Sequence, residues 1–135
     1  MKSQAAIEYL IIVSVAFMIL IPLGVYVNQS LIGYRDNNKI SKAWNTVKKL
    51  GQSADWVYSQ GPPAKISLEV YIPDDLEEVS IDNKNILFRV RTSAGISDVF
   101  YVTVPSLNGT IPSNSGYYFV SLTAFADYVN ISVVQ

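Results

Sequence analysis

The stretch that decides the fold is MKSQAAIEYLIIVSVAFMILIPLGVYV, residues 1–27. From Tyr9 to Val27 the chain contains no charged residue, and this length is close to the ~20 residues with which an α-helix crosses a bilayer. One carboxylate, Glu8, stands immediately before this run. An ionisable group at the head of an apolar span is energetically expensive, so Glu8 is a candidate functional residue.

The composition excludes several classes of protein. The chain has 135 residues, of which 50% are hydrophobic and 16% charged, and it contains neither cysteine nor histidine. Disulfides and thiolate zinc sites are therefore excluded, and the commonest general base is missing. The net charge of −1 gives no electrostatic footprint for nucleic acid. With no phosphate-binding loop or nucleophile motif, we expect a protein that is not an enzyme, with no catalytic residues, metal or cofactor.

The apolar run continues into a second helical pattern. It is too long for the core of a secretory signal peptide and ends in PLGVYVNQS, without a small-residue cleavage site. After a polar neck, residues 28–39, apolar residues recur at steps of three and four, as on one face of a helix. These residues are Ile40, Ala43, Trp44, Val47, Leu50, Ala54, Val57 and Tyr58. The sequence predicts one bent helix from about Gln4 to Ser59, in preference to two helices, ended by Gly61-Pro62-Pro63.

From Lys65 onward the apolar period changes from helical to strand-like. The segment 65–73 alternates apolar and polar residues, which is typical of a half-buried strand. Further strands are predicted at 77–81, 85–92, 98–104, 117–125 and 128–134, separated by turn residues that include Asn108-Gly109. We therefore expect an α+β fold, in which a long N-terminal helix precedes a small antiparallel β-sheet or β-sandwich head. The stripe at 40–58 is expected to complete the core of that head.

This architecture resembles a type IV pilin. Residues Gln4-Ala5-Ala6-Ile7-Glu8 and the following apolar residues are similar to the archaeal class III signal peptide, Q-x-S-x-E-x-x-x-L. The resemblance implies that a pre-pilin peptidase cuts between Ser3 and Gln4, which makes Glu8 the fifth residue of the mature chain. Ala6 stands in place of the family's serine, Ile12 in place of its leucine, and Ser3 in place of the usual glycine before the cut.

The resemblance suggests what Glu8 does. In a filament core of packed apolar helices, a carboxylate without a partner is strongly destabilising. The amino group freed at Gln4, in the same subunit or a neighbour, is the expected partner, so Gln4 and Glu8 would set the register of assembly. In the alternative interpretation, Glu8 stays hydrated at the headgroup boundary near Lys2.

Two sequence signals disagree about the side of the membrane on which the head lies. The positive-inside rule compares Lys2 and the amino terminus with Arg35, Lys39 and Lys42, and it favours a cytoplasmic head. Export is favoured by the signal motif and by three candidate N-glycosylation sites, at Asn28, Asn108 and Asn130. We expect export, with Asn108 the best acceptor because it falls in a predicted turn.

Three other groups of residues have structural interpretations. Trp44 and Trp56 are expected to be core residues against the sheet. The acidic group Asp74, Asp75, Glu77 and Glu78 is expected to form a solvated loop, because it lacks the spacing of a calcium loop. Tyr117-Tyr118-Phe119 is explained equally well by alternating burial in a strand and by a role in surface adhesion.

The sequence therefore predicts a structural subunit of an archaeal type IV pilus-like filament that serves surface attachment. Residues 1–3 would be a leader, 4–61 the helix and 62–135 the head, with 4–27 forming the membrane segment of the precursor and later the filament core. The expected partners are identical subunits, the pre-pilin peptidase, the assembly machinery and, before assembly, the membrane. The alternatives are a bitopic membrane-anchored extracellular binding module and a minor pilin or pseudopilin.

Overall fold

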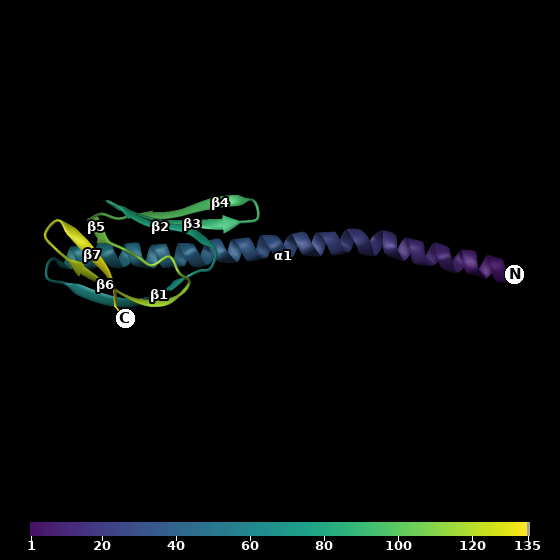
Figure 1. Cartoon of the computed structure of the whole chain (residues 1–135), viewed down its shortest axis with the longest axis horizontal. Helices are drawn as coiled ribbons and strands as arrows, with labels where there is room; N and C mark the ends of the chain where they lie inside the picture. The colour runs from purple at the N-terminus through teal and green to yellow at the C-terminus, as the bar shows by residue number, and fades with distance from the viewer. Residues whose placement is uncertain (135) are drawn as a thin grey trace. The chain divides into compact units, whose positions relative to one another are not determined.

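The computed structural model describes residues 1–134 and contains one helix followed by seven strands (Figure 1). Helix α1 runs without interruption through Lys2–Gln60. The strands are β1 (Lys65–Ile72), β2 (Leu76–Asp82), β3 (Asn85–Thr92), β4 (Gly95–Val102), β5 (Ser106–Gly109), β6 (Gly116–Ala124) and β7 (Tyr128–Val134). The predicted α+β class is confirmed. The chain divides into two compact units, residues 1–35 and a second that begins at Asp36, so the second half of α1 belongs to the same unit as the strands.

The strands form two sheets that are mostly antiparallel. The first has the order β1-β6-β7-β5 and the second the order β2-β3-β4. Among the strands of residues 1–134, only β5 and β7 run parallel. The backbone of Leu107 in β5 donates a hydrogen bond to the carbonyl of Asn83, in the turn between β2 and β3, and this bond links the two sheets.

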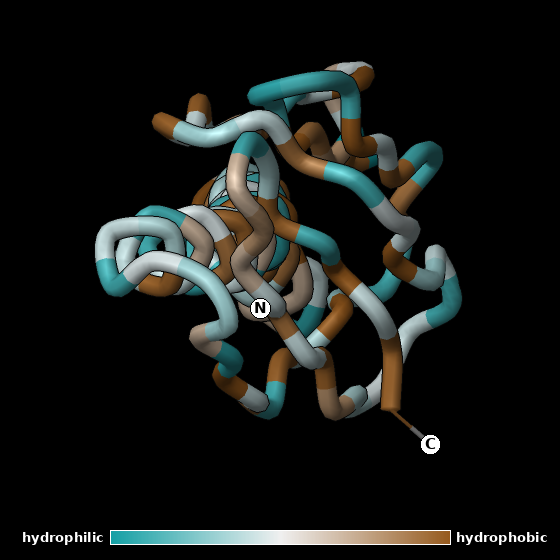
Figure 2. Tube along the Cα trace, turned by 90° about the vertical axis from the view of Figure 1, so that its left-hand side faces the viewer, coloured by the Kyte–Doolittle hydropathy of each residue, from teal (hydrophilic) through white to brown (hydrophobic). Residues whose placement is uncertain are grey.

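The second half of α1 provides the centre of the core, and the strands surround it. Figure 1 shows β2, β3 and β4 on one side of this part of the helix and β1 and β6 on the other. The burial of residues alternates along β1 and β3, and Figure 2 shows short apolar and polar segments following one another along the trace. Seven helix residues are buried among them: Ala43, Thr46, Val47, Leu50, Gly51, Ala54 and Val57. The strands contribute Ile72, Ile86, Phe88, Leu122 and Ile131, all less than 2% exposed.

The helix also forms polar contacts with the edge strands β1 and β4 and with the residues that follow β4. Thr46 and Lys49 donate side-chain hydrogen bonds to the carbonyls of Tyr71 and Glu69 in β1. On the opposite flank, Asp55 accepts hydrogen bonds from Tyr101 in β4 and from the backbone of Val104. Because an uncovered edge invites pairing with other chains, the bonds to the carbonyls of Tyr71 and Glu69 occupy part of the exposed edge of β1.

The structure corrects two of the predicted strand assignments. The turn predicted at Asn108-Gly109 is wrong, because both residues lie in β5, whose register pairs Asn108 with Asn130 of β7. β4 begins at Gly95 and ends at Val102, three and two residues earlier than predicted. Gly61, with φ 79°, ends α1 as expected.

Trp44 and Trp56 are not core residues, which contradicts the sequence prediction. Their side chains are 44% and 54% exposed. The strands cover only the arc of the helix between the flank facing β1 and the flank facing β4. Both tryptophans lie outside that arc, on the part of the helix surface that none of the seven strands covers.

Candidate membrane and assembly segment

The first half of α1 has no core of its own. Every residue from Met1 to Tyr34 is exposed except Val13, which is half-buried. The exposed side chains include long apolar ones on every side of the helix, among them Leu10, Ile11, Phe17 and Leu20. α1 is long and apolar enough to cross a membrane. A helix that is apolar all round requires lipid or other helices as its surroundings.

Few polar groups interrupt this surface. The hydroxyl of Ser14 donates a hydrogen bond of 2.7 Å to the carbonyl of Leu10, so it is satisfied within the helix. Pro22 lies inside the helix and has no N–H to donate to the preceding turn. Membrane helices tolerate such prolines because neighbouring groups satisfy the freed carbonyl.

The predicted processing and register residues lie at the start of α1. Ser3, Gln4 and Glu8 are all exposed. Gln4 and Glu8 are four residues apart on one helix, so they lie one turn apart on the same face. Within residues 1–134, Glu8 forms no ion pair and no side-chain hydrogen bond. Its carboxylate therefore has no partner among these residues.

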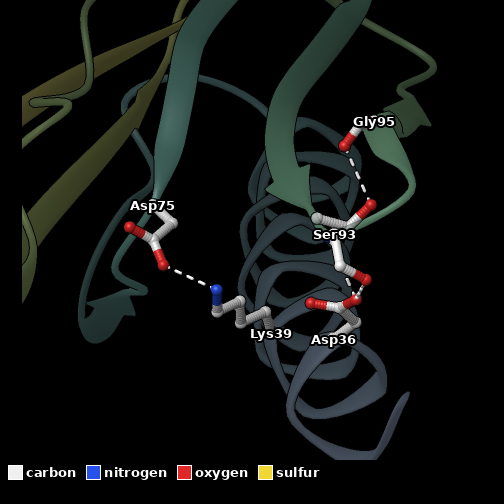
Figure 3. Close-up of polar contacts among 6 residues, drawn as sticks. Asp36, Lys39, Asp75, Ser93 and Gly95 are labelled. Atoms are coloured by element: carbon white, nitrogen blue, oxygen red, sulfur yellow. Dashed lines mark hydrogen bonds and ion pairs between the residues drawn. The ribbon is translucent and has the colours of Figure 1, made fainter. Parts of the chain in front are cut away.

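A polar cluster ties the start of the second unit to the strands (Figure 3). The Asp36 carboxylate accepts hydrogen bonds from the backbone N–H of Ser93, at 3.1 Å, and from the Ser93 hydroxyl. One turn later, Lys39 forms an ion pair of 2.6 Å with Asp75. The hydrogen bond from the Ser93 hydroxyl, aided by its backbone N–H and by Lys39, outweighs burial and lowers the pKa of Asp36.

A second polar cluster lies farther along the same helix. The Tyr101 hydroxyl donates to Asp55 at 3.0 Å, and the backbone N–H of Val104 donates to the other oxygen at 2.8 Å. Burial, followed by the nearby Asp55 carboxylate, raises the pKa of Tyr101. The Tyr101 ring packs directly on Gly51, where a Cβ atom would lie only 2.1 Å from the ring. Glycine is therefore required where β4 approaches the helix.

The uncovered side of the second half of α1 carries what we call the open face. It consists of the exposed residues from Ser41 to Trp56, which are Ser41, Lys42, Trp44, Asn45, Lys48, Lys49, Gln52 and Trp56. The open face carries three lysines and no acidic residue. Two of the lysines already have partners, since Lys42 lies 5.6 Å from the centre of the Tyr71 ring and Lys49 bonds to Glu69. Within residues 1–134, Lys48 has neither a hydrogen bond nor an ion pair.

The three candidate glycosylation sites lie in different surroundings. Asn28 is exposed on α1, Asn108 is exposed on β5, and Asn130 is half-buried on β7. Asn108 and Asn130 are directly paired across the parallel strands. Asn108 remains the more accessible of the two, although it lies in a strand.

The acidic group is only partly a loop. Glu77 and Glu78 belong to β2 and form ion pairs with Arg91 and Arg89 of β3, while Asp75 pairs with Lys39. Asp74 remains exposed before β2. Among residues 1–134 there is no cluster of acidic side chains arranged to hold a metal ion.

Sequence reasoning missed the contacts of Asp36, Gly51 and Asp55. Gly51 carried a usable signal, because glycine inside a helix costs about 1 kcal/mol relative to alanine and therefore often marks close packing.

Comparison with known proteins gives no match to a family model, a curated protein or a solved structure.

Proposed function

We propose that this protein is a structural subunit of an archaeal type IV pilus-like filament on the cell surface, assembled through residues 4–27. The observation that carries the proposal is the contrast along α1. Its first half is exposed and apolar on all sides, whereas its second half is the core of the β head. Such a helix can exchange lipid for the helices of other subunits without losing apolar contact.

The start of the chain supports the same proposal. Gln4 and Glu8 stand at the spacing seen in the class III signal peptide, with Ala6 in place of the serine between them. Cleavage between Ser3 and Gln4 would create an amine one helical turn from Glu8. A carboxylate held among apolar helices would then penalise any subunit docked out of register.

A membrane-anchored binding module is the second candidate, because lipid also accepts a helix that is apolar all round. In that case Glu8 lies at the headgroup boundary and remains hydrated. The two candidates differ in what happens after the helix has inserted into the membrane. A filament subunit still needs Glu8 and the small residues of the apolar segment for assembly, whereas an anchor does not.

Replacement of Glu8 by alanine tests the proposal. We expect Glu8→Ala to reach the membrane but to give far fewer filaments in electron micrographs of the cell surface. Ser14→Ala is the matched control, since its hydroxyl is satisfied within its own helix, and it should assemble like the wild type. Normal filament yield from Glu8→Ala would favour the anchored module.

A further inference from the structure

We propose that the free edge of β4 pairs with the same edge of a second copy, and that this pairing joins copies of neighbouring filaments. β4 is an outer strand of the sheet β2-β3-β4, so β3 covers only one of its two edges. An uncovered edge is a template for one further strand. The pairing itself requires only the folded head, and the proposed filament decides which copies can meet.

The register of β4 with β3 shows which backbone groups point outward. The N–H of Thr103 donates a hydrogen bond to the carbonyl of Lys84, which continues the β3–β4 ladder beyond the end of β4. Residues of an antiparallel strand alternate between bonding to a neighbour and facing away from it. The odd-numbered residues of β4 therefore bond to β3, and the even-numbered ones face the free edge. Within residues 1–134, the even-numbered residues from Ile96 to Val102 form no backbone hydrogen bond at that edge.

The side chains of these outward-facing residues make the edge apolar. Ile96, Phe100 and Val102 are each more than half exposed. The fourth residue, Asp98, forms an ion pair of 3.3 Å with Arg89 of its own sheet. A free charge on an edge strand discourages an incoming strand, but the charge of Asp98 is already compensated within the sheet.

The other outer strands carry features that obstruct pairing. On β1, side chains of α1 occupy the carbonyls of Glu69 and Tyr71. β2 has a register shift between Leu76 and Glu78 and contains three acidic residues. β5 has only four residues. Bulges, charges and short strands are the usual protections of natural edges, so β4 is the outer strand left open to a partner.

A second β4 matches this edge in both backbone and side chains. In a two-fold antiparallel pair with Phe100 opposite Phe100 of the second copy, Asp98 lies opposite Val102. All the paired residues are even-numbered, so every outward amide meets an outward amide, and the two Asp98 carboxylates stay apart. Directly opposed aromatic side chains stabilise a sheet. Because the contact uses the same edge of both copies, it closes with two copies and does not propagate.

The direction of β4 determines which copies can pair. Ser93, just before β4, bonds to Asp36, and Val104, just after it, bonds to Asp55. β4 therefore runs in the same direction as the second half of α1, and antiparallel pairing of two β4 strands sets these helix segments antiparallel. Copies in one filament repeat by rotation about its axis and translation along it, so helices that lie along the axis all point the same way. The pairing therefore joins filaments that run in opposite directions, and its expected result is lateral bundling.

Cross-linking of the full-length chain in detergent tests the pairing without any filament. The chain has no cysteine, so Phe100→Cys introduces a single thiol opposite its own copy, with Cα atoms about 5.5 Å apart. We expect a short thiol-reactive cross-linker to convert this variant to a dimer. Phe119→Cys is the matched control and should stay monomeric, because Phe119 is 57% exposed against 54% for Phe100 but lies in β6, which has a strand on each side. No dimer from Phe100→Cys, or equal dimer from both variants, would overturn the pairing.

Electron micrographs of surface filaments test what the pairing joins. We expect wild-type filaments to lie in lateral bundles and Phe100→Lys filaments to lie singly, because two lysines would then face each other in the pair. Phe119→Lys is the control and should bundle like the wild type. Single wild-type filaments, or bundled Phe100→Lys filaments, would overturn the joining of filaments. A cross-linked Phe100→Cys dimer from cells that form no filaments would support the pairing and overturn the proposed function instead.

Discussion

Asp36 in α1 binds the turn between β3 and β4. Its carboxylate accepts two hydrogen bonds from Ser93, and these lower its pKa below the ordinary value. A carboxyl group whose pKa is lower in the folded state than in the unfolded state stabilises the fold above the unfolded pKa, which is about 3.9 for aspartate. That stabilisation is lost as the pH falls through the lowered pKa of the folded state.

We therefore expect acid to weaken the head partly through Asp36. Thermal unfolding of the wild type should lose stability as the pH is lowered below about 4, and Asp36→Asn should show a smaller loss over the same range. Asp98→Asn is a suitable control, because Asp98 is an exposed acid paired only with Arg89. Identical acid profiles for Asp36→Asn and the wild type would show that Asp36 does not contribute.

Gly51 gives a second prediction at the scale of one residue. In an open helix, Gly→Ala stabilises by about 1 kcal/mol, but a Cβ at Gly51 would lie 2.1 Å from the Tyr101 ring. That ring cannot easily move, since its hydroxyl is bonded to Asp55. We expect Gly51→Ala to lower the free energy of unfolding by about 1–3 kcal/mol, the usual cost of overpacking.

Gly33 provides the control for this prediction. A Cβ atom there meets nothing within 4 Å, so Gly33→Ala should leave the unfolding of the head unchanged. Denaturant titration of both variants measures the difference. A Gly51→Ala variant as stable as the wild type would mean that Tyr101 does not pack on the helix as described.

At the scale of the element, α1 combines three environments within one uninterrupted helix. Residues up to Tyr34 are exposed and largely apolar, one face of the second half is buried, and the open face is exposed and basic. The buried face should therefore dominate the stability of the head, even though the largest side chains of the helix lie elsewhere.

Two helix variants test this division. Leu50 is 0% exposed, and Leu50→Ala should cost about 2–5 kcal/mol. Trp44→Ala should cost no more than about 1 kcal/mol, because the side chain is 44% exposed and lies outside the covered arc. Chemical denaturation distinguishes the two values. A larger loss for Trp44→Ala than for Leu50→Ala would contradict the described packing.

The sequence predicted the long elements well and the nonlocal contacts poorly. The helix and the alternating strands follow from periodicity, which is local. β5 has four residues, one strongly apolar side chain at Leu107, and an Asn-Gly pair that is typical of turns, so its parallel pairing with β7 could not be predicted. The position of Trp44 depends on how far the sheets extend around the helix, and the helical period contains no information about that extent.

The candidate site shows the same limit. The motif around Glu8 was visible in the sequence, as was the apolar run that follows it. The contacts of Lys42 and Lys49 could not be predicted, because the three lysines of the open face are equivalent until the strand beside them is known. Charge and spacing identify candidates, but only the fold shows which charges remain without partners.

At the scale of the whole molecule, the small residues of the apolar segment distinguish a filament from an anchor. A Cβ at Gly24 meets nothing within 4 Å, and Ala16 is exposed, so Gly24→Leu and Ala16→Leu cause no clash within the subunit. Packed helices are sensitive to added volume, at about 1–3 kcal/mol per site, whereas fluid lipid is not. We expect both variants to insert and fold but to form few filaments, as counted by electron microscopy. Val15→Leu, which adds little volume, is the control.

The most direct test of the account is the intact mass of this protein in filaments sheared from the surface of cells that produce it. The account predicts that the protein is present in the filaments as a chain that begins at Gln4, with residues 1–3 removed and any glycan seen as added mass. A chain that retains Met1 and is found only in the membrane fraction, with none in filaments, would contradict it.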